Sequence, residues 1–346
     1  MKVSDFDFHL PQELLAEYPS NKRDASKLMV INRQKATIEH HHFCDIPAFF
    51  EKGDLLIRNS TKVKAARYQA KKEHLNGAKL EILLINNVDG RTWEVFIDPL
   101  VKVKIGSTLL FRTEDLKAKI INIIEQRSVV IEFFQPDNLN DLNRLLKENG
   151  EMPIPRYIKR KPEEIDFDRY QTVYADKETA LAAPTSGLHF TKELISKIEN
   201  KGVEIADLNL EIGLGTFNPV YVDEIKDHNM HSEEYSISKS LASKVNYWKE
   251  KNKRVIALGT TSVRATESAF SNGILQSGKF KTDIFIYPPY KFNVADVLIT
   301  NFHTPRSTLL MLVCAFGGYE LIMKAYQEAI DENYRFYSYG DSMMVI

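Results

Sequence analysis

The fold is decided by the stretch Arg254-Val-Ile-Ala-Leu-Gly259, an apolar run that leads directly into Thr260-Thr-Ser-Val-Arg-Ala-Thr-Glu-Ser-Ala-Phe270. The apolar run predicts a buried strand, and residues 262–270 after it are predicted to form a helix. Further strands are predicted at residues 28–32, 54–59, 203–212, 283–287 and 297–300, and further helices at 191–200, 238–252, 307–316 and 320–330. Strands that alternate with helices predict an α/β fold whose mainly parallel sheet is covered by helices.

A different pattern interrupts this alternation near the start of the chain. Residues 68–134 are rich in β-branched and aromatic side chains, and Asp89-Gly90 between two runs is a strong hairpin signal. About six short strands are expected there, enough for a small antiparallel β-barrel. A short helix at 141–148 should end at Gly150, and Pro153 and Pro155 then mark an extended linker. We therefore expect an α/β catalytic domain at 1–66 and 151–346, with a six-stranded barrel domain inserted at 67–150.

The composition excludes several classes of protein. The chain has 346 residues, 43% hydrophobic and 27% charged, so it is long enough for about two domains and is not disordered. The longest apolar run, 309–316, is far shorter than the roughly 18 residues of a membrane span. The start carries Asp5 and Asp7 and no apolar segment, so no secretory signal is expected. The two cysteines, Cys44 and Cys314, exclude a disulfide framework and a cysteine-built metal site, and a cytoplasmic location is expected.

Basic residues gather in two places on a chain whose net charge is −1. Residues 58–72 contain six lysines and arginines and no acid, and residues 156–161 place four basic residues around Tyr157. A basic stripe that bears an aromatic side chain suits a localised polyanion site. The same charges would also suit an ordinary solvated face, and the sequence leaves both interpretations open.

Two glycine-containing turns are candidate ligand sites. Residues 259–262 join a strand to a helix, so their backbone N–H groups could bind a phosphate or a carboxylate, although a simple helix cap gives the same pattern. Glu211-Ile-Gly213-Leu-Gly215-Thr216-Phe217 has the acidic residue and Gly-x-Gly turn of class I methyltransferases. Because Phe217 replaces the third glycine and Pro219 follows, this second signal is weak.

Histidines supply the candidate acid–base groups. His189 lies in a loop of small residues that opens a helix, where it either faces a ligand or is a buried structural side chain. His228 and His231 precede Glu233. Their spacing could suit zinc on a helix, but no third ligand is evident, so no metal is expected and acid–base or orienting work is favoured.

Ordered blocks of residues run through the whole chain. They include Asp7-Phe-His-Leu-Pro11, Arg23-Asp-Ala-Ser26, Gly53-Asp-Leu-Leu-Ile-Arg-Asn59, Met152-Pro-Ile-Pro155-Arg-Tyr157, Arg169-Tyr170-Gln171, residues 182–191, 213–219 and 228–233, Gly259-Thr-Thr-Ser-Val-Arg264, Leu298-Ile-Thr-Asn301-Phe-His303 and Tyr334-Arg-Phe-Tyr-Ser338-Tyr-Gly340-Asp341. Together they resemble the S-adenosylmethionine:tRNA ribosyltransferase-isomerase family of bacterial queuosine biosynthesis. Three positions depart from the family pattern: Glu211 stands where histidine is usual, Pro289 replaces a glycine, and Ser186 replaces an alanine.

This resemblance implies an activity. Such enzymes transfer and isomerise the ribosyl unit of S-adenosylmethionine onto 7-(aminomethyl)-7-deazaguanine at the tRNA wobble position. The products are epoxyqueuosine-tRNA, adenine and methionine, so S-adenosylmethionine is a consumed co-substrate. The implied partner is a tRNA anticodon stem-loop with a GUN anticodon, with no membrane partner, and the family leans towards monomers.

The same resemblance, with the chemistry it requires, assigns candidate roles. A base must remove a proton beside the positive sulfur, and adenine leaves more readily when an acid protonates it. His231 and Glu233 are the expected acid–base residues, with His189 as second choice. The expected cofactor contacts are Gly213, Gly215, Thr216, Thr260, Thr261 and Arg264. The expected RNA contacts are Arg23, Arg58, Arg156 and Lys159, with Tyr170 or Tyr174 stacking on a base.

Two rival functions remain distinguishable by experiment. A class I S-adenosylmethionine-dependent RNA methyltransferase would leave S-adenosylhomocysteine. A noncatalytic tRNA-binding relative would retain tRNA and consume no S-adenosylmethionine.

Overall fold

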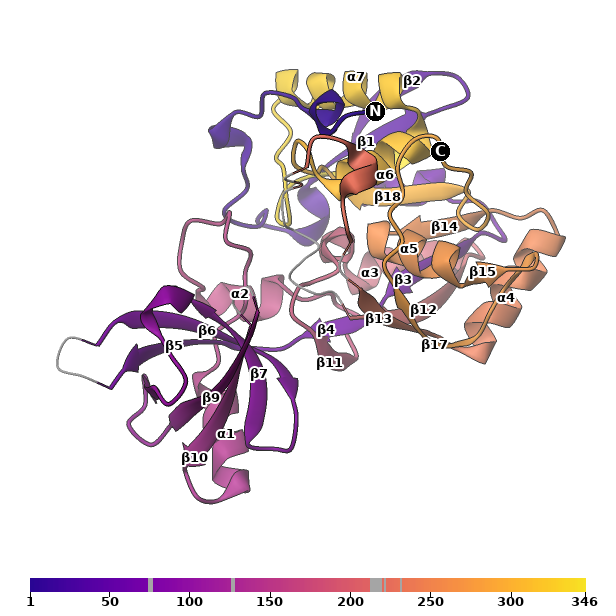
Figure 1. Ribbon diagram of the computed structural model, residues 1–346. Coiled ribbons are helices and arrows are strands. Elements are labelled where there is room, and N and C mark those ends of the chain that lie inside the picture. Colours follow the sequence, from indigo (N-terminus) through magenta and orange to yellow (C-terminus); the bar gives the residue numbers. More distant parts are fainter. Residues whose placement is uncertain (74–76, 126–127, 212–219, 221, 231) are drawn as a thin grey trace. The chain divides into compact units, whose positions relative to one another are not determined.

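The computed structural model describes residues 1–346 except 74–76, 126–127, 212–219, 221 and 231. The described residues form two compact units (Figure 1). The first unit comprises Met1–Lys62, Pro155–Lys161 and Asp168–Ile346, and the second comprises Val63–Ile154 and Pro162–Phe167.

A nine-stranded sheet is the centre of the first unit. Its strands, in spatial order, are β17 (Gly278–Thr282), β13 (Glu233–Ile237), β12 (Glu204–Leu210), β3 (Leu55–Asn59), β14 (Val255–Leu258), β18 (Val297–Asn301), β19 (Ser342–Val345), β1 (Lys27–Asn32) and β2 (Thr37–His42). Among the described residues, four neighbouring pairs are parallel and four are antiparallel. The sheet is therefore mixed, and the expectation of a mainly parallel sheet is not confirmed.

Parallel pairing dominates the middle of this sheet, where β12, β3, β14 and β18 lie side by side. Antiparallel pairs form both edges of the sheet, β13 with β17 and β12 at one edge and the hairpin of β1 and β2 at the other, and one further antiparallel pair, β18 with β19, lies inside it. Strand–helix units give parallel neighbours, as the sequence indicated, whereas a hairpin forces an antiparallel pair. The alternation of strands and helices does not reveal which strands occupy the edges.

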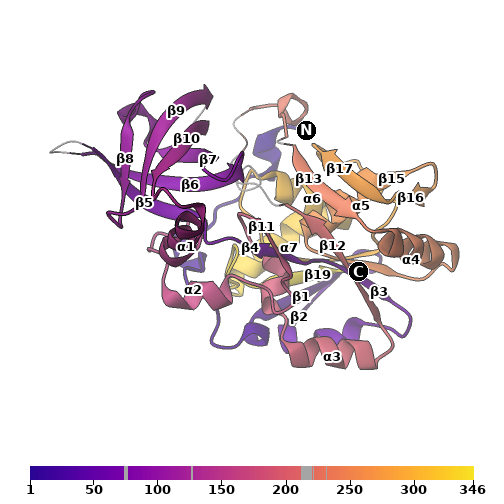
Figure 2. The same ribbon diagram turned by 90° about the horizontal axis from the view of Figure 1, so that it is seen from below.

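Helices cover both faces of the sheet (Figure 2). Side chains alternate along each strand, so Leu56 and Ile256 pack on the side of α3, and Ile57 packs on the opposite side with α4 and α5. The helices of this unit include α3 (Lys192–Asn200), α4 (Lys239–Glu250), α5 (Thr260–Ala269), α6 (Thr308–Gly317) and α7 (Tyr319–Asp331). These five confirm the predicted helices to within about two residues at each end.

Capping side chains set the start of several helices. The Thr191 hydroxyl accepts the Leu194 N–H at the start of α3, and the Ser238 and Ser307 hydroxyls act in the same way on α4 and α6. Nearly all of α5 and α6 is buried. No single helix in the described ranges has the length and apolar composition of a membrane span; α6 and α7 meet that test only as a pair bent by 117°.

The predicted strand at 283–287 is wrong. The ladder with β13 stops at Thr282, the last residue of β17. The Thr282 hydroxyl accepts the N–H of Ile284 at 3.1 Å, so this N–H bonds within its own turn. A threonine that satisfies a nearby backbone group competes with sheet pairing, and the apolar sequence alone does not reveal this.

A closed six-stranded antiparallel barrel forms most of the second unit and confirms that prediction. Its strands are β5 (Arg67–Lys72), β6 (Lys79–Asn87), β7 (Thr92–Asp98), β8 (Thr108–Phe111), β9 (Lys117–Glu125) and β10 (Ser128–Gln135), closed in the order β10-β7-β6-β5-β8-β9. At the predicted hairpin, Asp89 Oδ1 accepts the N–H groups of Arg91 and Thr92. Outside the central sheet and the barrel, the described residues of both units also form the helices α1 (Leu139–Asn149) and α2 (Glu164–Arg169). They form the short strands β4 (Thr61–Val63), β11 (Lys177–Ala180), β15 (Phe270–Ser271) and β16 (Ile274–Leu275) as well.

Candidate active site

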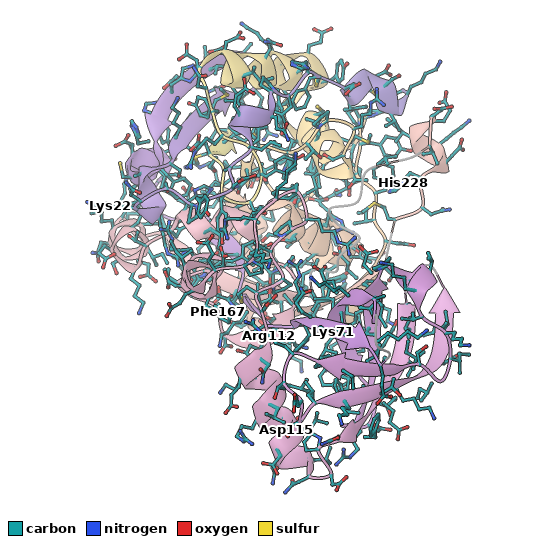
Figure 3. All side chains as sticks on the ribbon, turned by 90° about the vertical axis from the view of Figure 1, so that its left-hand side faces the viewer. Lys22, Lys71, Arg112, Asp115, Phe167 and His228 are labelled. Atoms are coloured by element: carbon teal, nitrogen blue, oxygen red, sulfur yellow. The ribbon has the colours of Figure 1, made fainter. Side chains whose placement is uncertain are left out.

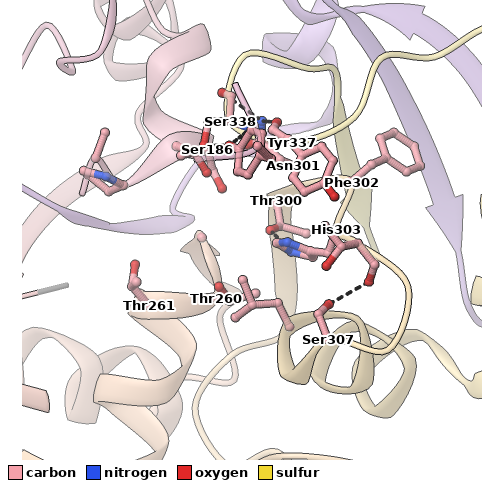
Figure 4. A pocket seen from close by; sticks show the side chains of 17 residues that line it. Ser186, Thr260, Thr261, Thr300, Asn301, Phe302, His303, Ser307, Tyr337 and Ser338 are labelled. Atoms are coloured by element: carbon pink, nitrogen blue, oxygen red, sulfur yellow. Dashed lines mark hydrogen bonds between the residues drawn. The ribbon is translucent and has the colours of Figure 1, made fainter. Parts of the chain in front are cut away.

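A pocket opens in the first unit where β14 and β18 end (Figure 4). It holds about 710 Å³ of empty space, with the solvent at its mouth included. Its walls come from chain segments that are far apart in the sequence: Tyr157, residues 183–186, 259–261 and 300–304, Ser307, Leu309, Tyr337 and Ser338. These segments include five of the ordered blocks seen in the sequence.

The start of α5 forms one wall of this pocket. Gly259 has φ +85°, a backbone conformation that favours glycine, and its N–H donates to Ile299 O at 2.8 Å. This turn lets β14 run directly into α5, so the positive end of the helix dipole faces the pocket wall. Thr260 and Thr261 lie on the first turn and are 6% and 7% exposed. Among the described residues, the buried Thr261 Oγ1 has no hydrogen-bond partner.

A tyrosine pair forms another wall. Tyr157 stacks on Tyr337 with ring centroids 3.9 Å apart. The Tyr157 hydroxyl accepts the Ser338 N–H at 2.9 Å and forms a second bond with the Ser338 hydroxyl. Burial raises the pKa of Tyr157 well above its usual range, so this phenol stays neutral.

His303 presents an imidazole to the pocket and was missed by the sequence reasoning. Its Nε2 lies 3.0 Å from Thr300 Oγ1, and its backbone N–H donates to the Tyr326 hydroxyl at 3.0 Å. Burial lowers its pKa to about 3, so the ring is neutral. The available signal was its position just after a polar strand end, Thr300-Asn301, at the edge of the sheet where ligands bind.

His189 is buried in this structure. It ends the short 3₁₀ turn Thr185–His189, which continues from the pocket wall, and it is 4% exposed. Its Nδ1 lies 2.7 Å from Ser26 Oγ, and its ring stacks on Phe43 with centroids 4.8 Å apart. Burial lowers the pKa of His189 to about 3. The residue therefore carries no charge near neutral pH.

Glu233 and Arg264 meet inside the first unit. Glu233 begins β13, Arg264 lies on α5, and their charged groups form an ion pair with side chains only 4% and 3% exposed. Arg264 Nε also donates to Ile284 O at 3.4 Å. Because both partners are buried, each charge is stabilised by the other, and either charge alone would be poorly solvated. The predicted site residues His231, Gly213, Gly215 and Thr216 lie outside the described residues.

The predicted RNA contacts fall into two groups. Arg156 and Lys159 are exposed, as a phosphate contact requires. Arg23 and Arg58 form bonds with other residues of the protein. Arg23 donates to the carbonyls of Asp168 at 2.7 Å and Gln171 at 2.8 Å.

Arg58 bonds Asp207 at 2.6 Å and lies over the ring of Tyr174, 4.0 Å from its centroid. Burial raises the pKa of the Tyr174 phenol. Tyr170 is fully buried and packs edge-on against Tyr339. Neither ring is an open stacking platform in this conformation.

Among the residues that the structure describes, carboxylate, imidazole and thiol groups do not gather around a common point. Within the described ranges, no cluster of three or more histidine, cysteine, aspartate or glutamate side chains could hold a metal ion. The pocket chemistry is instead that of hydroxyls, amides and neutral rings.

The fold and the pocket are those of an α/β protein with a candidate ligand site where the central strands of a mixed sheet end, and with a small β-barrel as its second unit. A family model described as queuosine biosynthesis protein matches residues 3–345, so the chain belongs to this family. The resemblance inferred from the sequence blocks is thereby confirmed.

Relatives match over the full length of the chain. A protein of Cytophaga hutchinsonii is 47% identical over 349 residues, and one of Moorella thermoacetica is 44% identical over 347 residues, with 100% of both chains covered in each comparison. Both relatives are named S-adenosylmethionine:tRNA ribosyltransferase-isomerase. The crystal structure of S-adenosylmethionine tRNA ribosyltransferase from Thermotoga maritima matches 99% of this chain and 100% of its own, at 36% identity and a TM-score of 0.56.

Proposed function

We propose that this chain transfers and isomerises the ribosyl group of S-adenosylmethionine onto 7-(aminomethyl)-7-deazaguanine at the wobble position of tRNA, giving epoxyqueuosine-tRNA, adenine and methionine. The observation that carries this proposal is full-length similarity to relatives named S-adenosylmethionine:tRNA ribosyltransferase-isomerase, one of which is 47% identical. The pocket at the start of α5 supports it, because separate sequence blocks converge there.

S-adenosylmethionine is the proposed co-substrate, and the first turn of α5 is its proposed carboxylate site. Backbone N–H groups at a helix start favour an anion. The unpartnered Thr261 hydroxyl supports a ligand contact, because buried polar groups normally have a partner. We keep Thr260, Arg264, Gly213, Gly215 and Thr216 as further proposed contacts. The ion pair with Glu233 favours a positioning role for Arg264, since that pair fixes α5 against β13.

The proposed reaction needs a base for the ribose proton beside the sulfonium and an acid for the departing adenine. We propose His231 with Glu233 for this work, and His189 as the second choice. Neutral His303 adds a hydrogen-bonding group within the pocket itself. No metal is part of the proposal.

The proposed macromolecular substrate is a tRNA anticodon stem-loop with a GUN anticodon. Exposed Arg156 and Lys159 support phosphate contacts. Arg23, Arg58, Tyr170 and Tyr174 remain in the proposal, and their internal bonds favour an indirect role that shapes the RNA-facing segments. We further propose a cytoplasmic monomer without a membrane partner, with its catalytic domain at 1–66 and 151–346 and its barrel domain at 67–150.

One incubation tests the reaction. The protein is mixed with S-adenosylmethionine and an anticodon stem-loop that carries the aminomethyl-deazaguanine, and all products are analysed by mass spectrometry. Epoxyqueuosine in the RNA with equimolar free adenine is the expected result. S-adenosylhomocysteine with a methylated RNA would replace the proposal by a methyltransferase. RNA binding without any consumption of S-adenosylmethionine would indicate a noncatalytic relative.

A further inference from the structure

Three lysines of the barrel lie in one row across neighbouring strands. Lys79 on β6 is directly opposite Lys71 on β5, which is opposite Leu110 on β8, which in turn is opposite Lys117 on β9. Residues directly opposite one another in an antiparallel ladder project from the same face. We call Lys79, Lys71 and Lys117 the lysine row; Figure 3 marks Lys71.

The row lies on the outer face of the barrel. Its chain neighbours Ala70, Leu80 and Ala118 are buried in the barrel interior. Side chains alternate between the two faces of a strand, so the lysines point outward. Lys71 and Lys79 are exposed, and Lys117 is partly exposed. The charges are thus accessible to a ligand in solvent.

The directly opposed pair of Lys71 and Lys79 opposes folding. Like charges directly opposite on two strands are destabilising. Within the described part of the chain, none of the three lysines forms an ion pair. The charge of the lysine row is therefore not neutralised by an ion pair among the described residues.

A loop adds a fourth positive charge beside the row. Lys72, next to Lys71 in sequence, donates from Nζ to the Lys102 carbonyl at 3.5 Å. This bond brings the short turn Leu100–Lys102 next to β5, and the Lys102 side chain is exposed. The net charge of the whole chain is only −1, so this is a local positive surface on a neutral protein.

We propose that the lysine row binds the phosphate backbone of the tRNA substrate outside the nucleotide that reacts. The inference rests on the proposed function for the identity of its partner. Strands about 4.8 Å apart spread the row over roughly 14 Å, a length along which one strand of a nucleic-acid duplex presents about four phosphates. Lysine is a flexible point charge that suits phosphate without reading bases. The row therefore contributes affinity that does not depend on sequence.

The test is the triple variant Lys71→Gln, Lys79→Gln and Lys117→Gln in the full chain. Turnover is measured against full-length tRNA and against S-adenosylmethionine, and tRNA binding is measured between about 0.05 and 0.2 M salt. We expect the KM for tRNA to rise roughly 10-fold, while the KM for S-adenosylmethionine and kcat at saturating tRNA stay unchanged. The slope of log binding constant against log salt should become shallower by about 2–3, since each lost phosphate contact removes close to one.

Thermal unfolding separates this role from a structural one. Removal of a repulsive pair should leave the melting temperature unchanged or raise it, whereas loss of a structural contact lowers it. The matched control replaces three exposed lysines of the first unit, Lys35, Lys239 and Lys324, by glutamine, with the same loss of charge. The control should keep the wild-type tRNA KM and salt slope.

Two results would overturn the inference. One is a lysine-row variant with the wild-type tRNA KM and salt slope. The other is an equal effect in row and control variants, which would mean that net charge alone matters. If the wild-type protein binds tRNA but transfers no ribosyl group, the proposed reaction fails, and the binding comparison still decides the role of the row.

Discussion

Removal of one charge from the buried pair of Glu233 and Arg264 should destabilise the first unit strongly. Glu233→Gln keeps the size and shape of the side chain but removes its charge. The Arg264 guanidinium would then remain in a site where it is 3% exposed, and its other partner among the described residues is the Ile284 carbonyl at 3.4 Å. One Arg264 nitrogen, Nη2, already lacks a partner among the described residues. The protein has little means to solvate the orphaned charge.

The magnitude follows from this burial. Removing one partner of a buried ion pair costs about 3–5 kcal/mol, because the remaining charge stays desolvated. Glutamine retains a hydrogen-bond acceptor, so the lower end, about 3 kcal/mol, is expected for Glu233→Gln. A domain with roughly 5–15 kcal/mol of stability would lose a large share of it. The double variant Glu233→Met with Arg264→Met removes both charges and should lie within about 2 kcal/mol of wild type.

Urea unfolding followed by tryptophan fluorescence measures the change in the free energy of unfolding of the first unit. Trp248 packs in the core of the first unit, where its indole N–H donates to Gly53 O, and Trp93 belongs to the barrel. A Trp93→Phe background therefore reports on the first unit. The control is Glu234→Gln at the neighbouring position, where the side chain is 64% exposed and pairs with Lys281; it should change stability by less than about 0.5 kcal/mol. A loss below about 1 kcal/mol for Glu233→Gln would refute the reasoning.

Three further predictions concern the pocket and the histidine behind it. Burial lowers the pKa of His189 from 6.5 to about 3, so the unfolded chain binds an extra proton between these values, and stability falls as pH drops from about 6.5 towards 3. At pH 5 the free energy of unfolding should be about 2 kcal/mol lower than at pH 7.5. His189→Asn should remove this difference when urea unfolding is measured at both pH values, and an unchanged pH dependence of stability in the variant would contradict the prediction. Thr261→Val should raise the KM for S-adenosylmethionine roughly 10-fold without loss of stability, because Oγ1 has no partner among the described residues. Thr266→Val, which loses a bond to Ser262 O at 2.8 Å, is the structural control and should lower stability instead. Tyr157→Phe leaves the buried Ser338 N–H without its acceptor and should cost about 1–3 kcal/mol by urea unfolding; a change below about 0.5 kcal/mol would contradict it.

Local signals in the sequence predicted much of the fold. The helix predicted at 191–200 forms as α3, with Thr191 as its cap, and Asp89 holds the hairpin that belongs to the closed barrel. These features depend on residues a few positions apart, so a linear pattern contains them. The strand predicted at 283–287 is wrong because one side chain, Thr282, satisfies the backbone locally. Hydrophobic pattern alone does not reveal that competition.

Burial and internal pairing were harder to predict at the site. Tyr170 and Arg58 are residue types that often contact RNA. Tyr170 is nevertheless fully buried, and Arg58 lies against Tyr174 and Asp207. An aromatic or basic residue type indicates what a side chain can do, and only the tertiary structure decides whether a ligand can reach it. Glu233 was predicted as an acid–base residue, and its ion pair with Arg264 emerged from the packing of α5 against β13.

The site itself follows from the arrangement of the sheet. Parallel strands end at the same edge, so β14 and β18, although nearly forty residues apart in sequence, deliver the turn at Gly259 and the segment of Asn301 to His303 to one place. β19 runs antiparallel to β18, so its beginning lies at that same edge, and Ser338, four residues before β19, reaches the pocket from the opposite chain direction. His303 lies at the pocket because it follows the end of β18, and its neighbours in the sequence do not reveal this position. A mixed sheet thus accounts both for the pairing that sequence reasoning missed and for the convergence of distant blocks on which the proposed function depends.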